Sequence, residues 1–291
     1  MYFWWYKVKI VLTGARGFIG SYFKKQYDHK YIIHPFSFVK DDLSHLHLKD
    51  VEAVIHLSAL VHQMGGTSDE AYELVNVKQT LELALKAKES GVKQFIFMST
   101  VKVYGEESDV AYTEISPCQP EDVYGRTKLK AEQELQALAD EDFVVSIIRT
   151  PIVYGRGVKA NMQSLMKLID KIPLLPFGGI NNKRSLVYIG NLCALLDVLI
   201  DQRKGGFFLA GDDEPLSTTE LIQQLAKAKK KKVLLIKLPL FAVLLKWCKS
   251  SFYKRLFENL VVDNSYTKEV LHFKNPYSTQ EGISLMVRGS M

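Results

Sequence analysis

A tyrosine and a lysine four positions apart form the pair in this chain that is best suited to proton transfer. Tyr124 and Lys128 lie in a stretch with a helical pattern, so their side chains project from one face, one turn apart. A nearby ammonium favours the tyrosinate and lowers the tyrosine pKa toward a value useful for proton transfer. Because the chain has 14 tyrosines, this spacing also arises by chance, and the place of the pair decides its meaning. Thr100 offers a further hydroxyl at the end of a predicted strand upstream.

Three glycines spaced three apart follow an apolar run at residues 8–12. In a strand–turn–helix context Gly14 would form the tight turn, Gly17 would let a pyrophosphate approach, and Gly20 would let the helix pack on the strand. The helix that follows points free backbone N–H groups and the positive end of its dipole at bound phosphates. The stretch therefore predicts a dinucleotide-binding loop upstream of the tyrosine–lysine pair.

The second predicted strand, residues 31–36, should end near the adenosine ribose of the dinucleotide, where an acid usually binds the ribose hydroxyls. No acid stands at residues 36–40, and the first acids are Asp41 and Asp42. Asp42, followed by Leu43, suits a loop contact with adenine instead. With nothing at the strand end to repel a 2′-phosphate, we expect affinities for NAD and NADP within about tenfold of each other.

The rest of the pattern alternates short apolar runs with longer amphipathic stretches, which is typical of a parallel sheet with helices on both faces. Strands are expected at residues 51–56, 93–98 and 143–149, and helices at residues 70–90 and 122–139. We therefore predict an α/β fold with a Rossmann-type doubly wound parallel sheet and a smaller α+β lobe toward the C-terminus. Residues 1–155 would bind the dinucleotide and residues 156–291 mostly the substrate, with about residues 184–210 returning to the first domain.

Local patterns predict the role of a few more residues. Ser217 and Glu220 have the spacing of a capping box at the start of a helix. The tail from Asn259 predicts a last helix that covers the substrate lobe. His56, at the end of an apolar strand, is more simply a core histidine than a catalytic one.

The composition is that of a globular protein, with 47% hydrophobic and 24% charged residues. The three cysteines lie far apart without metal-ligand spacing. This argues against a zinc site or a disulfide framework and fits a reducing compartment, so we expect a cytoplasmic protein. The longest later apolar stretch, residues 238–245, is too short to span a bilayer.

Much of the net charge of +6 comes from one lysine run, residues 227–232, so the charge does not indicate a nucleic-acid partner. Lysines at the C-terminus of a helix complement its dipole and stay solvated, which is the simpler interpretation of the run. The sharper hypothesis pairs it with the aromatic N-terminus, residues 1–6, as a patch for a membrane surface.

With these motifs the chain resembles the extended short-chain dehydrogenases/reductases, in the NAD-dependent epimerase/dehydratase group typified by UDP-glucose 4-epimerase. The motifs that carry the resemblance are TGARGFIG at residues 13–20, VIHLSA at 54–59, Asn76-Val77 with Thr80, Ser99-Thr100 with VYG at 103–105, YGRTK at 124–128 and RTPIVYG at 149–155. They span about the first two-thirds of the chain in the family's order. The resemblance implies that Tyr124 is the catalytic acid and base, that Lys128 holds the nicotinamide ribose and tunes the tyrosine, and that Thr100 hydrogen-bonds the reacting oxygen.

The same resemblance implies the binding residues. The cofactor, NAD or NADP, would contact Gly14, Gly17, Phe18, Ile19, Gly20, Asp42, Leu43, Leu57, Ser58, Ala59, Asn76, Ser99, Tyr124, Lys128 and Pro151. A UDP-sugar would contact Thr100, Lys102, Asn161, Arg184 and Arg255, and the planar arginine side chains suit its diphosphate. Val101 and Lys102 stand where the family's 4,6-dehydratases have an Asp-Glu pair, so dehydratase chemistry is not expected.

The implied activity is hydride transfer at C4 of a UDP-sugar, in the synthesis of precursors for cell-surface polysaccharides. We favour a reductase of 4-keto-6-deoxy sugars, because a loose adenosine contact suits cofactor exchange and a compact substrate lobe leaves little room for a rotating intermediate. The alternative is a UDP-glucose or UDP-N-acetylglucosamine 4-epimerase that keeps NAD tightly bound. A non-catalytic dinucleotide-binding sensor and a membrane-associated scaffold are the remaining alternatives. A homodimer through the helices at residues 70–90 and 122–139 is also expected.

Overall fold

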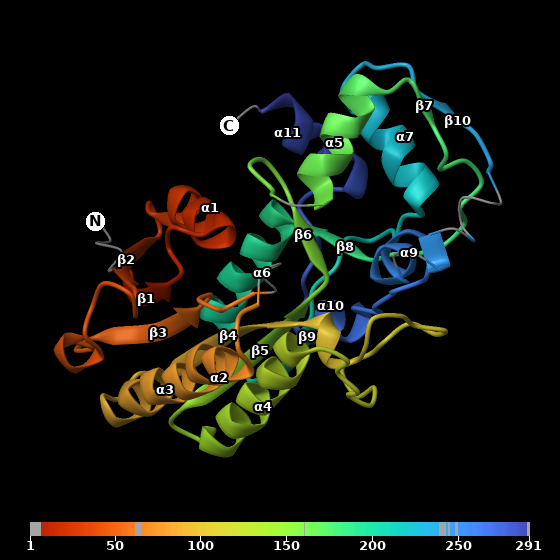
Figure 1. Cartoon of the computed structure of the whole chain (residues 1–291). Helices are drawn as coiled ribbons and strands as arrows, with labels where there is room; N and C mark the ends of the chain where they lie inside the picture. The colour runs from red at the N-terminus through yellow and green to blue at the C-terminus, as the bar shows by residue number, and fades with distance from the viewer. Residues whose placement is uncertain are drawn as a thin grey trace.

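Figure 1 shows a computed structural model of the chain, which describes residues 7–61, 66–159, 161–238, 243, 245–247 and 250–289. A parallel sheet with helices on both faces forms its larger part, and a smaller group of helices and short strands lies at one end. The α/β fold with a Rossmann-type doubly wound sheet, predicted from the sequence, is confirmed. Within the described residues, no helix is both long and apolar enough to cross a membrane.

The main sheet has six strands in the order β2-β1-β3-β4-β5-β9, all parallel. Their bounds are β1 Val8–Thr13, β2 Tyr31–Phe36, β3 Val51–His56, β4 Gln94–Thr100, β5 Val144–Thr150 and β9 Gly206–Leu209. The central strands read as unbroken apolar runs because both of their faces are covered. Pro35 is tolerated in β2 because this strand lies at the sheet edge and pairs with β1 alone.

The strand order reverses between β1 and β3. The link from β2 to β3 is short and holds only a single 3-10 turn, η1 (Leu43–His45), so β3 returns to the far side of β1. The carboxyl ends of β1 and β3 therefore lie side by side, with Gly14 following one and Leu57 the other. In doubly wound sheets this is where ligands bind.

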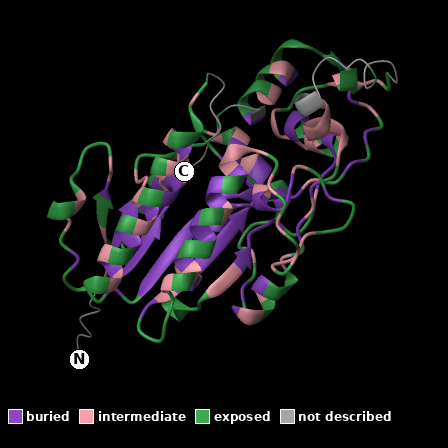
Figure 2. Ribbon diagram, turned by 60° about the horizontal axis from the view of Figure 1, so that its bottom comes forward, coloured by how far each residue is buried: buried purple, intermediate pink, exposed green. Residues whose placement is uncertain are grey.

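Helices cover the two faces of the sheet, and Figure 2 shows buried strands beneath helices with exposed outer sides. Ile10 and Leu12 pack toward α1 (Phe18–Tyr27) and α6 (Ile189–Gln202), whereas Val11 packs toward α3 (Gln79–Glu89) and α4 (Val123–Leu138). This alternation follows from the two-residue period of a strand. The helix pair α3 and α4 lies side by side as expected, but the homodimer through it stays a prediction.

The helix expected at residues 70–90 is interrupted. The structure has α2 (Asp69–Glu73), a π-helical turn η2 (Leu74–Lys78) and then α3. Asn76 lies in this π turn. Such wide turns inside helices are often found at functional sites, and apolar periodicity gives no signal for one extra residue in a turn.

The C-terminal part forms the smaller lobe. β6 (Ile152–Tyr154) pairs with β8 (Leu186–Tyr188), and β7 (Leu174–Leu175) pairs with β10 (Leu234–Leu235). The helices of this part are α5 Asn161–Lys171, α7 Thr218–Ala228, α9 Ser250–Phe257, α10 Ser265–Val270 and α11 Thr279–Arg288. The capping box at the start of α7 is confirmed, but the tail expected to form one helix forms two, α10 and α11. The domain boundary after residue 155 stays a prediction.

Candidate active site

The glycine loop after β1 is shaped by close backbone contacts. Gly14 has a φ of 65°, and its carbonyl accepts a hydrogen bond from the N–H of Gly17 at 2.8 Å. A side chain at Gly20 would collide with the Gly14 carbonyl and lie 2.8 Å from the Cα of Ala15. The loop thus leaves the N-terminus of α1 open to a ligand, and the residues present fit the pyrophosphate of a dinucleotide.

The loop after β3 is held against the glycine loop. A Cβ at Gly14 would lie 3.1 Å from both the Leu57 carbonyl carbon and the Ser58 nitrogen. The hydroxyl oxygen of Thr13 accepts hydrogen bonds from the N–H groups of Leu57 and Ser58, each at 3.1 Å. Three predicted cofactor residues therefore meet at the strand-order reversal.

His56 is a buried core histidine with both ring nitrogens bonded. Its Nε2 lies 3.0 Å from the hydroxyl of Thr80, which already donates its proton to the Asn76 carbonyl. Nε2 must then be the donor, and Nδ1 accepts from the hydroxyl of Thr13 at 2.9 Å. Burial, with a further contribution from Lys128, lowers the pKa of His56 to about 3, so the ring is neutral.

Asn76 connects this network to α4. Its Oδ1 accepts the N–H of Leu60 at 2.8 Å, and its Nδ2 donates to the Leu60 carbonyl at 3.0 Å and to the hydroxyl of Thr127 at 3.2 Å. Asn76 therefore links the loop after β3 to Thr127 of α4, the residue before Lys128, by hydrogen bonds. The cofactor contact predicted for Asn76 stays a prediction.

The start of α4 is fixed against the turn that follows β4. Asp122 caps the helix by accepting the N–H of Gly125 at 2.7 Å, and it also binds the ammonium of Lys102 at 2.6 Å. A Cβ at Gly125 would lie 2.8 Å from the carbonyl oxygen of Lys102. Because Lys102 lies two residues after Thr100, these contacts hold the end of β4 close to the helix turn that carries Tyr124.

Lys102 is an ion-paired residue in this structure. Its ammonium lies 2.5 Å from Glu106 and 2.6 Å from Asp122. Burial lowers the pKa of Lys102, but the bonds to the two carboxylates outweigh it and the net direction is upward. Lys102 therefore stabilises the start of α4, and its contact with a substrate stays a prediction.

Tyr124 is partly buried near the N-terminus of α4. Its pKa is raised, first by burial and then by the carboxylate of Asp122 and by Tyr72. This direction is opposite to the lowering expected from Lys128. A tyrosinate here is costly, so base chemistry at Tyr124 needs a positive charge close to its hydroxyl.

Lys128 is 1% exposed, and its Nζ lies 3.7 Å from the centre of the Phe97 ring in β4. Burial lowers the pKa of Lys128 to about 7, although the carboxylate of Glu132 opposes this. The lysine is thus only partly charged at neutral pH. The raised pKa of Tyr124 has other causes, namely burial, Asp122 and Tyr72. Lys128 and His56 are close enough for the charge of one to lower the pKa of the other.

A buried ion pair that the sequence patterns do not predict lies one helical turn beyond Lys128. Glu132, one helical turn further along α4, binds Arg149 of β5, with Nη2 2.6 Å from Oε2. The hydroxyl of Ser99 donates to Glu132, and Arg149 also donates to the hydroxyl of Tyr104 at 2.7 Å. The sequence holds one signal for this pair. Glu132 is a charged residue on the buried side of α4, and Arg149 is a charged residue at the end of the apolar run that forms β5.

A carboxylate from the loop after β2 lies close to the end of that strand. The backbone N–H of Ser37, the residue that follows β2, donates to Oδ2 of Asp41 at 2.8 Å. The chain folds back here, so that the carboxylate of Asp41, four residues later, lies beside the end of β2. Asp42 is used locally, where it accepts the N–H of Ser44 at 2.8 Å, so its adenine contact stays a prediction.

The remaining cofactor residues lie along the same edge of the sheet or in the link from β2. They are Phe18 and Ile19 in the first turn of α1, Leu43 in η1, Ala59 in the loop after β3, and Pro151 between β5 and β6.

Arg184 lies against α9, the helix that carries Arg255. Arg184 donates to the carbonyl oxygens of Lys254 at 3.3 Å and of Glu258 at 3.2 Å, at the C-terminal end of that helix. Burial lowers the pKa of Arg184, Glu106 opposes this, and the positive charge of Arg255 lowers it further. Residues 71 positions apart in the sequence are thus neighbours, although their contact with a diphosphate stays a prediction.

Ion pairs hold α9 against the loop between β4 and α4. The ammonium of Lys254 lies 3.2 Å from Glu121 and 3.6 Å from Glu107. Arg184, which feels the charge of Glu106, therefore lies on the side of the small lobe that faces this loop. Asn161 begins α5, and its side chain lies outside the described part of the structure.

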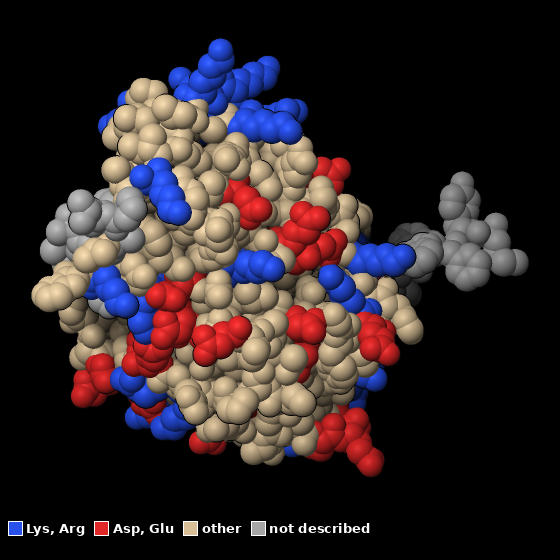
Figure 3. Space-filling view, turned by 90° about the vertical axis from the view of Figure 1, so that its right-hand side faces the viewer, with Lys and Arg blue, Asp and Glu red and all other residues tan. Residues whose placement is uncertain are grey.

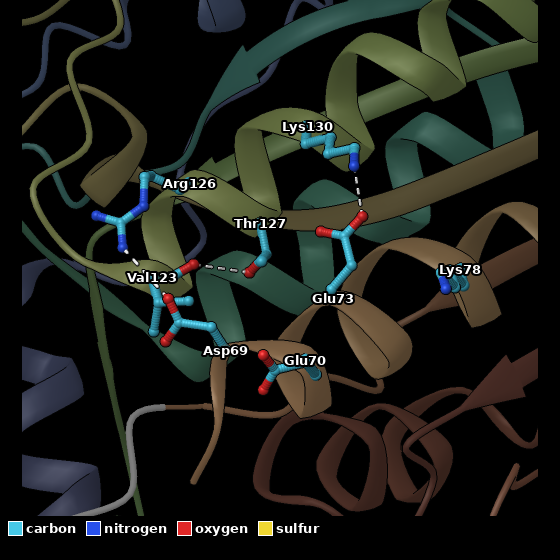
Figure 4. A pocket seen from close by; sticks show the side chains of 8 residues that line it. All are labelled: Asp69, Glu70, Glu73, Lys78, Val123, Arg126, Thr127 and Lys130. Carbon is cyan, nitrogen blue, oxygen red and sulfur yellow. Dashed lines mark hydrogen bonds and ion pairs between the residues drawn. The ribbon is translucent and has the colours of Figure 1, made fainter. Parts of the chain in front are cut away.

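A hollow of about 410 Å³ lies elsewhere, between α2 with η2 and the first half of α4 (Figure 4). Ion pairs line it, because Lys130 binds Glu73 and Arg126 lies 3.9 Å from Asp69. Thr100, Tyr124 and Lys128 are not among its lining residues. It is a charged groove on the outer side of the helices and not the proton-transfer site.

Comparison with known proteins decides the family. The model of the NAD-dependent epimerase/dehydratase family matches residues 10–211. The chain belongs to this family. It is therefore an enzyme of the extended short-chain dehydrogenase/reductase type, as the sequence motifs predict. The motifs left NAD and NADP open, and the family match indicates NAD as the cofactor.

Relatives of this epimerase/dehydratase chain include sugar epimerases with different carriers. It is 40% identical, over an alignment 309 positions long, to a UDP-glucose 4-epimerase of Vibrio cholerae, covering 94% of this chain and 92% of the relative. It is 26% identical to an N-acetyl-α-D-glucosaminyl-diphospho-ditrans,octacis-undecaprenol 4-epimerase of Escherichia coli O157:H7, over 79% of this chain and 75% of that one. The solved UDP-glucuronic acid 4-epimerase of Bacillus cereus, in complex with NAD, has the same fold, with a TM-score of 0.78, 22% identity and coverage of 97% and 98%.

Proposed function

We propose that this chain is a UDP-sugar 4-epimerase that keeps its NAD through each turnover. The observation that carries the proposal is the 40% identity to a UDP-glucose 4-epimerase across nearly the whole chain. The reductase favoured from the sequence rested mainly on a missing acid at the end of β2. Asp41, whose carboxylate lies beside the end of β2, would supply that acid, and this weakens the case for rapid cofactor exchange.

Each residue of the site has a role in this reaction. Bound NAD supplies a reversible hydride acceptor for C4 of the sugar. Tyr124 would take the proton of the C4 hydroxyl and return it to the C4 oxygen after the sugar has presented its other face. Thr100 would hold that oxygen by a hydrogen bond, and protonated Lys128 would offset the high cost of the Tyr124 tyrosinate. Arg184 and Arg255 would bind the diphosphate, so the sugar can turn while its carrier stays fixed.

A sugar diphosphate carried on a polyprenol is the second candidate substrate. The relative from Escherichia coli acts on such a compound, and it matches 79% of this chain. The diphosphate is common to both carriers, so the same pair of arginines would serve either one. The higher identity of the UDP-glucose 4-epimerase favours the nucleotide.

The purified protein tests the proposal without any added cofactor. UDP-glucose and UDP-N-acetylglucosamine are supplied separately, and their C4 epimers are followed by NMR over many turnovers. We expect steady interconversion of at least one pair. Turnover that occurs only with a 4-keto-6-deoxy sugar and added reduced cofactor would instead identify a reductase, and no turnover with any of these would favour the sensor.

Asp41 gives a prediction about cofactor choice that replaces the expectation of affinities within about tenfold of each other. Its carboxylate should repel the 2′-phosphate of NADP and bind the ribose hydroxyls of NAD. Asp41→Asn should therefore shift the ratio of the two dissociation constants toward NADP by about tenfold, or about 1.4 kcal/mol. Titrating both cofactors measures this, with Asp42→Asn as the matched control. An unchanged ratio in the Asp41 variant would remove Asp41 from the cofactor site.

A further inference from the structure

A long stretch of the small lobe is basic and contains no acid at all. Residues 221–257 hold ten lysines and arginines and no aspartate or glutamate. Since the whole chain has 38 basic and 32 acidic residues, the rest of the chain carries a net negative charge. The net positive charge of the protein is therefore concentrated in this segment. Interaction with a helix dipole accounts only for the lysines near the C-terminus of α7 (Thr218–Ala228).

The described part of this segment forms a hollow of about 600 Å³ that combines lysines with apolar side chains. Its lining residues, which we name the lysine–leucine surface, are Pro173, Gln223, Ala226, Lys227, Lys231, Lys232, Val233 and Leu234. The three lysines are exposed, and Figure 3 shows basic side chains gathered at the end of the molecule where Figure 1 places the turn between α7 and β10. Asp170 of α5 faces the run as well, but it pairs with Lys229 at 3.0 Å.

Large apolar side chains are exposed beside these lysines. Leu234 is 64% exposed, and its partner across the β7–β10 pair, Leu174, is 47% exposed. Further along the same acid-free segment Leu238, Val243 and Trp247 are 47%, 57% and 87% exposed. Protein surfaces that lie in the headgroup region of a membrane are typically rich in lysine, leucine and tryptophan.

We propose that the lysine–leucine surface docks this protein onto an anionic lipid bilayer. Lysines near a negatively charged leaflet are attracted to it, and the exposed apolar side chains would enter the headgroup layer. The apolar side chains favour a bilayer over a nucleic acid, whose phosphates reward charge alone. The proposed docking is peripheral, with the side chains of this surface reaching no deeper than the headgroup layer.

The segment also sets how the protein would face the bilayer. α9, which carries Arg255, belongs to the same acid-free stretch, so the small lobe and not the glycine loop would face the headgroups. The proposal does not depend on which sugar is the substrate.

Sedimentation of the full chain with vesicles tests the proposal. The probes are vesicles of phosphatidylcholine alone and of phosphatidylcholine mixed with phosphatidylglycerol. Lys231→Glu/Lys232→Glu reverses two charges of the surface, and Lys24→Glu/Lys25→Glu on the exposed side of α1 is the matched control. Trp247→Ser and Ile115→Ser, both at highly exposed positions, form a second matched pair.

We expect binding to the anionic vesicles that weakens with salt, is at least about tenfold weaker in the lysine variant, and is unchanged in its control. Trp247→Ser should weaken binding and Ile115→Ser should not. Equal binding by both lysine variants, equal binding to neutral vesicles, or binding to a DNA duplex in preference to vesicles would each overturn the proposal. Turnover of UDP-glucose, measured separately, should be the same in all four variants, so this result and the epimerase test can fail independently.

Discussion

Tyr124→Phe should reduce turnover by roughly 10²- to 10⁴-fold while leaving NAD binding nearly intact, because the ring still packs but the proton donor and acceptor is lost. The kinetic signature is a fall in kcat with little change in the dissociation constant for NAD. Steady-state kinetics together with a cofactor titration measures both quantities. The pKa of Tyr124 is raised, so wild-type activity should increase with pH below about pH 7 as the base form becomes easier to reach. Above about pH 7 the increase should level off, because Lys128 then loses the proton that offsets the tyrosinate.

Tyr72→Phe is the matched control for this variant. Its ring lies near enough to raise the pKa of Tyr124, and its own hydroxyl donates to the carbonyl of Val61 at 3.2 Å. We expect it to retain activity within about tenfold of the parent, since it removes only a neighbouring hydroxyl. If the Tyr124 variant kept a similar activity, tyrosine would have no part in the proton transfer.

Lys128→Met should inactivate the enzyme and at the same time stabilise its fold by about 1–3 kcal/mol. The lysine is fully buried, and burial lowers its pKa to about 7. Methionine has a similar shape and needs no hydration. Glu132 keeps Arg149 as its partner in the variant, so no unpaired charge is left behind.

The pH dependence of stability follows from the same pKa. An unfolded lysine holds its proton up to about pH 10.4, whereas folded Lys128 loses it near pH 7. Between these values the unfolded state binds more protons, so this group makes the free energy of unfolding rise with pH. The advantage of the methionine variant should therefore be largest at pH 7 and below, and it should shrink toward pH 10.

Urea unfolding at several pH values measures this effect. Lys130→Met, two residues on and exposed in an ion pair with Glu73, is the control and should change stability by about 0.5 kcal/mol or less. A methionine variant at position 128 that is less stable than the parent at pH 7 would mean that the ammonium is well solvated or paired in the folded protein.

The elements that the sequence predicted correctly are those stabilised by contacts between residues close together in the chain. The bounds of β2 and β3 follow directly from their apolar runs, and Asp122 ends the loop before α4 because its side chain can cap the helix. The glycine loop was also predictable, because the backbone conformation and close contacts at Gly14 and Gly20 exclude side chains. These features depend on residues within one turn or one strand.

The features that could not be predicted depend on distant contacts. The π turn at Asn76 exists where its amide reaches Leu60 and Thr127, which no helical periodicity encodes. Glu132 and Arg149 come from a helix and a strand whose packing sets their pairing. Asp41 was visible in the sequence, but only the fold of the loop brings its carboxylate back to the end of β2.

The fate of a deuterium placed on C4 of UDP-glucose tests the central claim most directly. The purified protein is incubated with the labelled substrate in ordinary water, with unlabelled NADH added in excess, and the C4 epimer is analysed by mass spectrometry. An epimerase that keeps its cofactor returns the same label, so we predict that nearly all of the product carries deuterium at C4. A product without the label, or a label recovered in the free cofactor pool, would show that the cofactor leaves during turnover and would contradict the account.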